Sequence, residues 1–173
     1  MMQRALSIAA LVSSLVLAAG SAASAATGTF NVVSSIVVAS VCTYNGSPTL
    51  AFASYDPIVA NATAAATATG ALSITCPDTL AYTVTANLGS NSGHASGSCA
   101  TTTCSRAMVS GGNYLSYDIY TTSGLTTVWN STNGIAGTGS GVAQTVNVYG
   151  YIPPAQVAPA GSYADTVTVT VTF

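Results

Sequence analysis

The sequence predicts an all-β protein, a sandwich of short strands. Several stretches alternate apolar and polar residues, segments rich in Gly, Ser, Asn and Pro separate them, and no segment has a convincing helical pattern. The clearest alternation is the last stretch, 166–173, which reads TVTVTVTF and places Val167, Val169, Val171 and Phe173 on one face. We expect the free side of this strand to be covered by an earlier part of the chain or by another molecule.

The N-terminus is typical of a secretory signal peptide, because Arg4 is followed by an apolar run and an Ala-Ser-Ala cleavage site. We place cleavage after Ala25, with the next residue as the other option. The rival interpretation, a transmembrane anchor, needs a longer apolar run. The predicted organisation is therefore a signal peptide over 1–25, an N-terminal extension over 26–41 and one β-sandwich domain over 42–173.

The extension contains a long stretch of extended character, residues 27–41, with no Pro and one Gly. Both of its faces carry apolar groups, which indicates a strand buried in more than one context. One face comprises Phe30, Val32, Ser34, Ile36 and Val38. The alternative is an ordinary first strand of the sandwich.

The first half of the domain begins with a turn-rich connection over 43–69, which includes a possible short strand at Leu50–Phe52. Alternation then predicts strands at 71–76 and 80–88, joined through Pro77-Asp78 as in a hairpin.

The second half of the domain is predicted to start with a loop over 89–112. Further strands follow at 114–120, 126–129 and 142–151, with a second loop over 131–141. The terminal strand completes the sandwich.

The low charge of the chain restricts its partners. Only 3% of the residues are charged, and removal of the leader leaves Arg106 with Asp56, Asp78, Asp118 and Asp165, a formal charge of −3. A chain so poor in cations cannot hold a phosphate backbone, which argues against nucleic acid as a partner.

The four cysteines, an even number behind a signal peptide, predict two disulfides with three possible connectivities. Cys99 and Cys104 bracket four residues, which favours a local bridge and leaves Cys42 to pair with Cys76. A zinc site that combines His94 with cysteines would be expected to show a paired CxxC spacing, and none is present.

No residue pattern indicates catalysis. His94 is the single histidine and lies in a Gly/Ser-rich segment, the aspartates are scattered, and no phosphate-binding or calcium-binding loop is present. Nine tyrosines are compatible with carbohydrate binding, but strand tyrosines more often pack against a sandwich. We therefore predict that the protein is not an enzyme and uses no cofactor and no metal.

Motifs along the mature chain resemble the spore coat protein U domain family, which includes subunits of archaic chaperone–usher (Csu-type) pili. The matching elements are the extension ending at Cys42, Leu50-Ala51-Phe52, Tyr55-Asp56-Pro57, Gly70 to Cys76, Tyr82 to Gly89, Leu115 to Tyr120, Tyr149 to Pro153, and Gly161-x-Tyr163-x-Asp165 with the alternating valines up to Phe173. The terminal pattern is the most specific of these. The chain differs from the rod pilin in its Cys99 to Cys104 loop and its near absence of charge.

The resemblance implies an incomplete, six-stranded immunoglobulin-like sandwich that lacks its seventh strand and is completed by a donor strand from a neighbouring subunit. The implied acceptor groove runs beside the C-terminal strand, at Val167, Val169, Val171 and Phe173. The implied donor face is Phe30, Val32, Ser34, Ile36 and Val38, of which Ser34, at the centre, would fill the groove least well. The implied partners are a periplasmic chaperone, an outer-membrane usher and identical or related pilin subunits.

These observations favour a structural pilin that is secreted through the periplasm and polymerises at the cell surface for adhesion and biofilm formation. A secreted spore or cell coat protein of the same fold is the first alternative. The second is a self-contained secreted module, for example for carbohydrate, whose residues 27–41 fold back as its own first strand.

Overall fold

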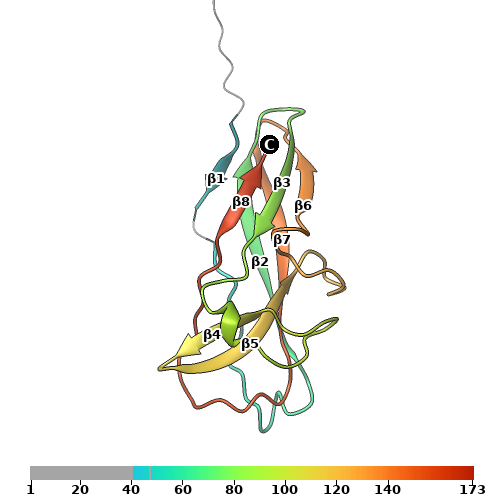
Figure 1. Cartoon of the computed structure of the whole chain (residues 1–173). Helices are drawn as coiled ribbons and strands as arrows, with labels where there is room; N and C mark the ends of the chain where they lie inside the picture. Colours follow the sequence, from blue (N-terminus) through green and yellow to red (C-terminus); the bar gives the residue numbers. More distant parts are fainter. Residues whose placement is uncertain (1–40, 47) are drawn as a thin grey trace, which may run out of the picture. The chain divides into compact units, whose positions relative to one another are not determined.

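The computed structural model describes residues 41–46 and 48–173, and these residues form two antiparallel β-sheets (Figure 1). They contain eight strands and one short 3₁₀-helix, with no α-helix among them. The elements are β1 (Thr43–Asn45), β2 (Ala66–Thr75), β3 (Ala81–Ala86), η2 (Ser92–His94), β4 (Arg106–Ser110), β5 (Asn113–Tyr120), β6 (Ile135–Thr138), β7 (Ala143–Ile152) and β8 (Val169–Thr172). The predicted all-β fold class is thereby confirmed.

The larger sheet has the strand order β1-β2-β7-β5-β4, and the smaller sheet has the order β6-β3-β8. β2 and β7 pair along their whole length, from Ala66 opposite Ile152 to Thr75 opposite Ala143. In the smaller sheet β3 lies at the centre and pairs with β6 on one side and β8 on the other. The sheet edges are therefore β1 and β4 in one layer and β6 and β8 in the other (Figure 1).

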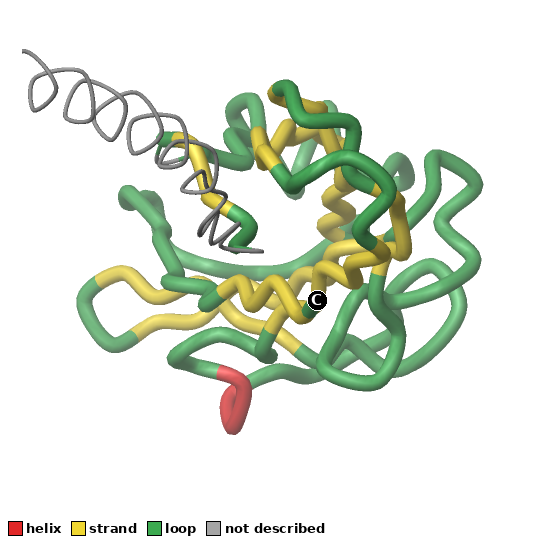
Figure 2. The backbone as a smooth tube through the Cα atoms, turned by 90° about the horizontal axis from the view of Figure 1, so that it is seen from above, coloured by secondary structure: helices red, strands yellow, loops and turns green. Residues whose placement is uncertain are grey.

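The core lies between the two sheets, because alternate side chains of each strand point into the same interior. β2 contributes Leu72 and Ile74, and β3 contributes Tyr82 and Val84, all of which are buried. The indole of Trp129 is also buried and donates from Nε1 to the Val84 carbonyl at 2.8 Å. Figure 2 shows that the rest of the described chain is strand and loop apart from the single helical turn η2.

The predicted hairpin between 71–76 and 80–88 is wrong. β2 and β3 belong to different sheets, so the Pro77-Asp78 connection crosses from one layer to the other. Its backbone pairs instead with the segment after β6, where Thr79 N–H donates to Gly139 O at 3.0 Å. Alternation correctly identified two strands with inward faces, but it does not specify which strands are neighbours.

Several shorter predictions also differ from the structure. Residues 126–129 form an isolated bridge at Val128 instead of a strand, and Leu50–Phe52 is not a strand. Conversely, β4 and β6 lie in segments that were predicted to be loops. The described residues thus hold eight strands instead of the expected six, partly because β1 and β6, with three and four residues, are too short to show alternation.

Candidate functional site

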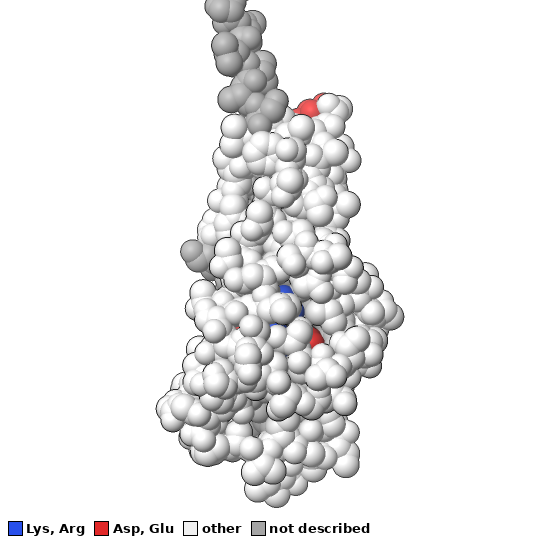
Figure 3. Space-filling model, in the orientation of Figure 1, with Lys and Arg blue, Asp and Glu red and all other residues white. Residues whose placement is uncertain are grey.

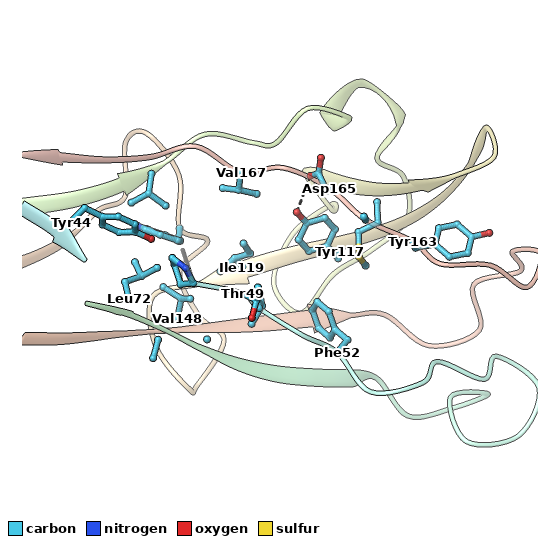
Figure 4. Close-up of a pocket in the computed structure, with 18 residues that line it drawn as sticks. Tyr44, Thr49, Phe52, Leu72, Tyr117, Ile119, Val148, Tyr163, Asp165 and Val167 are labelled. Carbon is cyan, nitrogen blue, oxygen red and sulfur yellow. Dashed lines mark hydrogen bonds between the residues drawn. The ribbon is translucent and has the colours of Figure 1, made fainter. Parts of the chain in front are cut away.

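An open groove lies between the free edge of the larger sheet at β1 and the free edge of the smaller sheet at β8. It has a volume of about 470 Å³ and reaches down to buried side chains between the sheets (Figure 4). Its floor includes the side chains of Leu72 from β2, Val148 from β7 and Ile119 from β5. The whole lining comprises Tyr44, Pro48, Thr49, Leu50, Phe52, Gly70, Ala71, Leu72, Met108, Tyr117, Ile119, Trp129, Val148, Tyr163, Ala164, Asp165, Val167 and Val169.

The C-terminal segment forms one wall of this groove, and its side chains alternate as predicted. Val167, Val169 and Val171 are half-buried and pack against the core, whereas the intervening threonines are exposed. Val167 and Val169 line the groove itself. Phe173, at the end of the segment, is 53% exposed. The regular strand β8 covers only part of the predicted range 166–173, although Thr168 still accepts a hydrogen bond from the Asn87 amide at 2.9 Å.

The hydrogen-bond pattern of β8 leaves one row of backbone groups unpaired by the neighbouring strand. The backbone N–H of Asn87, the residue after β3, donates to the Thr168 carbonyl, and Thr170, two residues further along, lies opposite Thr85 of β3. Because N–H and C=O groups alternate sides along a strand, the threonines direct theirs to β3 while Val169 and Val171 direct theirs to the open edge. The apolar wall is therefore also an available sheet edge.

The segment that carries Leu50 and Phe52 also lines the groove. Their side chains pack over Gly70 and Gly150 of the neighbouring strands β2 and β7, and the Phe52 ring meets Tyr117 edge to face with centroids 6.3 Å apart. A Cβ at Gly150 would lie only 2.5 Å from Phe52 Cζ. The absence of a side chain at this position is what lets the ring lie against the sheet.

We expect Gly150→Ala to lower the free energy of unfolding by about 1–3 kcal/mol, the usual cost of overpacking. Phe52 must move outward and lose its contact with Tyr117. Urea denaturation measures the change in the free energy of unfolding. The matched control is Gly93→Ala, where a Cβ meets no atom within 4 Å; equal losses for both variants would contradict the packing role of Gly150.

A polar cluster interrupts the apolar wall at Asp165. Its Oδ2 accepts a hydrogen bond from the Tyr117 hydroxyl at 2.8 Å, and its Oδ1 accepts from Ser90 N and from Asn91 Nδ2, both at 3.0 Å. Gly89 approaches this carboxylate so closely, with φ +81°, that a side chain at this position would collide with it. Burial, and next the hydrogen bond to Asp165, raise the pKa of Tyr117, so the phenol stays protonated as the donor.

A buried ion pair lies behind the groove floor. Arg106 and Asp118 are both completely buried, with Nη1 and Oδ1 3.2 Å apart. Arg106 Nη2 also donates to the carbonyls of Asn87 and Trp129, both at 2.6 Å, and Asp118 accepts from Ser105 N and Oγ. Burial lowers the pKa of Arg106 and raises the pKa of Asp118, while the attraction between the two charges opposes both shifts.

The two predicted disulfides, Cys42–Cys76 and Cys99–Cys104, are both present. The first ties the residue before β1 to the residue after β2, so it anchors the start of β1 to the end of its neighbouring strand. The zinc alternative loses its ligands, because all four thiols are oxidised. His94 instead stacks on Tyr114 with ring centroids 3.8 Å apart.

Loss of the Cys42–Cys76 bridge is expected to destabilise the sandwich more than loss of the local bridge. The sequence separations are 34 and 5 residues, for which chain entropy gives about 4 and about 2 kcal/mol. Urea denaturation of the two double-alanine variants measures the difference. A larger loss for the Cys99–Cys104 variant would show that loop closure does not dominate the effect.

Sequence reasoning found part of this site. It predicted the valine wall, whereas the predicted donor face, from Phe30 to Val38, lies outside the described residues. It missed the floor residue Trp129 and the Tyr117–Asp165 pair. Asp165 lies two residues before Val167, and residues two apart along a strand share a face, so the alternation already indicated that Asp165 lies on the valine face.

The described residues form a two-sheet sandwich with a groove between two of its strand edges, and the comparisons with known proteins identify the family. The family model for the Spore Coat Protein U domain matches residues 26–170. "Protein U" of Myxococcus xanthus is 36% identical over 174 residues, and the match covers 96% of each chain. The chain therefore belongs to the Spore Coat Protein U domain family, as the sequence motifs predicted. This is a structural family and not a family of enzymes.

A solved structure is also similar to this chain. It is the CsuC–CsuE chaperone–tip adhesion subunit pre-assembly complex from the archaic chaperone–usher Csu pili of Acinetobacter baumannii, matched with a TM-score of 0.53 and 25% identity. The match covers 79% of this chain, which spans only 40% of the length of the matched chain. Within the described part of this chain, no helix has the length and apolar character that a membrane span requires.

Proposed function

We propose that the protein is a pilus-type subunit that polymerises head to tail by donor-strand exchange. The observation that carries the proposal is the groove, in which a half-buried valine wall borders a floor of core side chains and an available sheet edge. An added strand satisfies both, because its main chain pairs with β8 while its alternate side chains fill the groove. The similarity to a chain of a chaperone–subunit pilus complex supports the same assignment.

The strand that fills the groove is the N-terminal extension of the next subunit, about residues 27–38. Its inner face carries four large apolar side chains, Phe30, Val32, Ile36 and Val38. At about 1.5–3 kcal/mol for each buried side chain, they contribute roughly 6–12 kcal/mol before backbone hydrogen bonds are counted. Subunits joined in this way dissociate very slowly, as a surface fibre requires.

Before assembly, a periplasmic chaperone lends the strand that covers the groove, and an outer-membrane usher exchanges it for the extension of the next subunit. The mature fibre lies at the cell surface and serves adhesion and biofilm formation. Its exterior is built from Thr, Ser, Asn and Gly with few charges, in agreement with the nearly uncharged face in Figure 3.

The test is the size distribution of the purified mature protein in SDS electrophoresis without boiling, beside a version that starts at Ser40. We expect an SDS-resistant ladder that is seen only when the extension is present. A monomer in both preparations, with the shortened chain still folded, would contradict polymerisation and favour a self-contained module.

A second candidate is a coat protein that assembles into a layer around a cell or spore. It is favoured by the description of the matching family model, Spore Coat Protein U domain, and by the 36% identity to "Protein U" over nearly the whole of both chains. The two candidate functions use the same groove and differ in the assembly that the subunits form, a fibre or a layer. Immunogold labelling distinguishes them, since a pilin is expected in thin fibres and a coat protein in a continuous envelope.

A further inference from the structure

Asp165 is the only charged residue among the described residues that line the groove. It lies between Tyr163 and Val167 on the wall, and its side chain meets Tyr117 at the groove surface (Figure 4). Its carboxylate is only half-buried in the open groove. An inserted strand that covers Asp165 with an apolar side chain would remove water from the carboxylate without replacing its hydrogen bonds.

The extension has one polar residue on its inner face. Ser34 occupies the centre of that face, with Phe30 and Val32 before it and Ile36 and Val38 after it. Once inserted, its hydroxyl is cut off from water and needs a hydrogen-bond partner within the groove. The Tyr117–Asp165 pair offers acceptor oxygens on both side chains.

We infer that Ser34 of the inserted strand lies opposite Asp165 and thereby sets the register of the subunit joint. The inference rests on the proposed donor-strand function. Every strand pair among the described residues is antiparallel, so we take the inserted strand as antiparallel to β8. Val32 then lies opposite Val167, and Ile36 lies opposite Tyr163.

Other registers are disfavoured in two ways. A slip by one residue turns the opposite face of the inserted strand into the groove, and that face holds only Val33 and Val37 as large apolar side chains, beside Asn31 and Ser35. A slip by two residues keeps that face inside but places Val32 or Ile36 over Asp165 and leaves the Ser34 hydroxyl against apolar groups. The cost of such unpaired polar groups corresponds to a preference on the order of tenfold to a hundredfold for the matched register.

Disulfide trapping tests the register in the full mature protein. Since Val167 and Val169 direct their backbone groups to the open edge, residues opposite them form hydrogen-bonded pairs with Cα atoms about 5.5 Å apart, a separation that a disulfide spans. Three double variants are compared by SDS electrophoresis after oxidation, with boiling and without reductant. Val32→Cys with Val167→Cys tests the inferred register, whereas Val32→Cys with Val169→Cys and Phe30→Cys with Val167→Cys test the two slips.

We expect efficient covalent oligomers only from Val32→Cys with Val167→Cys. A comparable yield from either slipped pair would overturn the register. So would the absence of cross-linking in all three variants while the protein without added cysteines still forms its SDS-resistant ladder. If that ladder is itself absent, the proposed donor-strand function has failed, and the register inference fails with it.

The role of the hydroxyl is tested in the Val32→Cys, Val167→Cys background. The measured quantity is the cross-linking yield of this pair divided by the yield of a slipped pair that carries the same substitution at Ser34. We expect Ser34→Val to lower this ratio at least fivefold. Ser34→Thr retains the hydroxyl and should leave the ratio unchanged. An unchanged preference with Ser34→Val would show that the apolar residues alone set the register and would overturn the role of Ser34.

Discussion

Arg106→Met is expected to lower the free energy of unfolding of the subunit by about 3–5 kcal/mol, the usual cost of removing one partner from a buried ion pair. The substitution leaves the buried Asp118 charge without its counter-ion and removes the donor to the carbonyls of Asn87 and Trp129. Urea denaturation followed by the fluorescence of Trp129, the single tryptophan, measures the loss.

Two further variants define the cause of that loss. Arg106→Met combined with Asp118→Leu should recover part of the stability, because no unpaired charge remains. In addition, Arg106 Nε has no hydrogen-bond partner among the described residues even in the intact pair. Asp78→Asn, in a turn that is exposed, should change stability by less than about 0.5 kcal/mol. A loss below about 1 kcal/mol for Arg106→Met would contradict the structural role of the pair.

Val169→Asp is expected to reduce the SDS-resistant ladder at least tenfold while the subunit still folds. In the open groove Val169 is only half-buried, so water reaches a carboxylate placed there. Under an inserted strand the same carboxylate would be buried against apolar side chains, which costs several kcal/mol. Gel densitometry of unboiled samples gives the loss, and circular dichroism reports whether the fold is retained.

The matched control is Thr170→Asp, on the exposed face of the same strand. It adds the same charge one residue away, but that charge stays in water when the groove is filled. We expect its ladder to remain within about twofold of the ladder of the unsubstituted protein, since surface substitutions cost little. Equal losses from the two variants would indicate a general effect of charge on β8 and not a filled groove.

The sequence predicted the strands whose two faces differ, because alternation reports burial directly. β3, β7 and β8 are of this kind, and so is the valine wall of the groove. β4 was missed because it lies in a segment rich in Gly, Ser and Thr and starts at Arg106, a residue type that is normally exposed. Arg106 can be buried because Asp118 and two backbone carbonyls from other parts of the chain accept hydrogen bonds from its guanidinium.

Long-range relations account for the other differences. Alternation in β2 and β3 showed two inward faces, but it did not show that these faces meet across the core in different sheets. The Tyr117–Asp165 pair joins residues 48 positions apart, and neither residue alone indicates the other. The groove itself consists of the gap between β1 and β8, which are near the opposite ends of the domain.

A mixing experiment with two complementary defects tests the central claim most directly. One chain carries Ile36→Asp, which spoils the inserted strand and leaves the groove intact, and the other carries Val169→Asp, which does the reverse. Each chain alone should remain monomeric in unboiled SDS electrophoresis. Their mixture should yield a single SDS-resistant heterodimer and no longer species, because only one functional joint is possible. Mixtures without this dimer, from chains that are folded and monomeric, would contradict the assignment of the β1–β8 groove as the acceptor of the next subunit's extension.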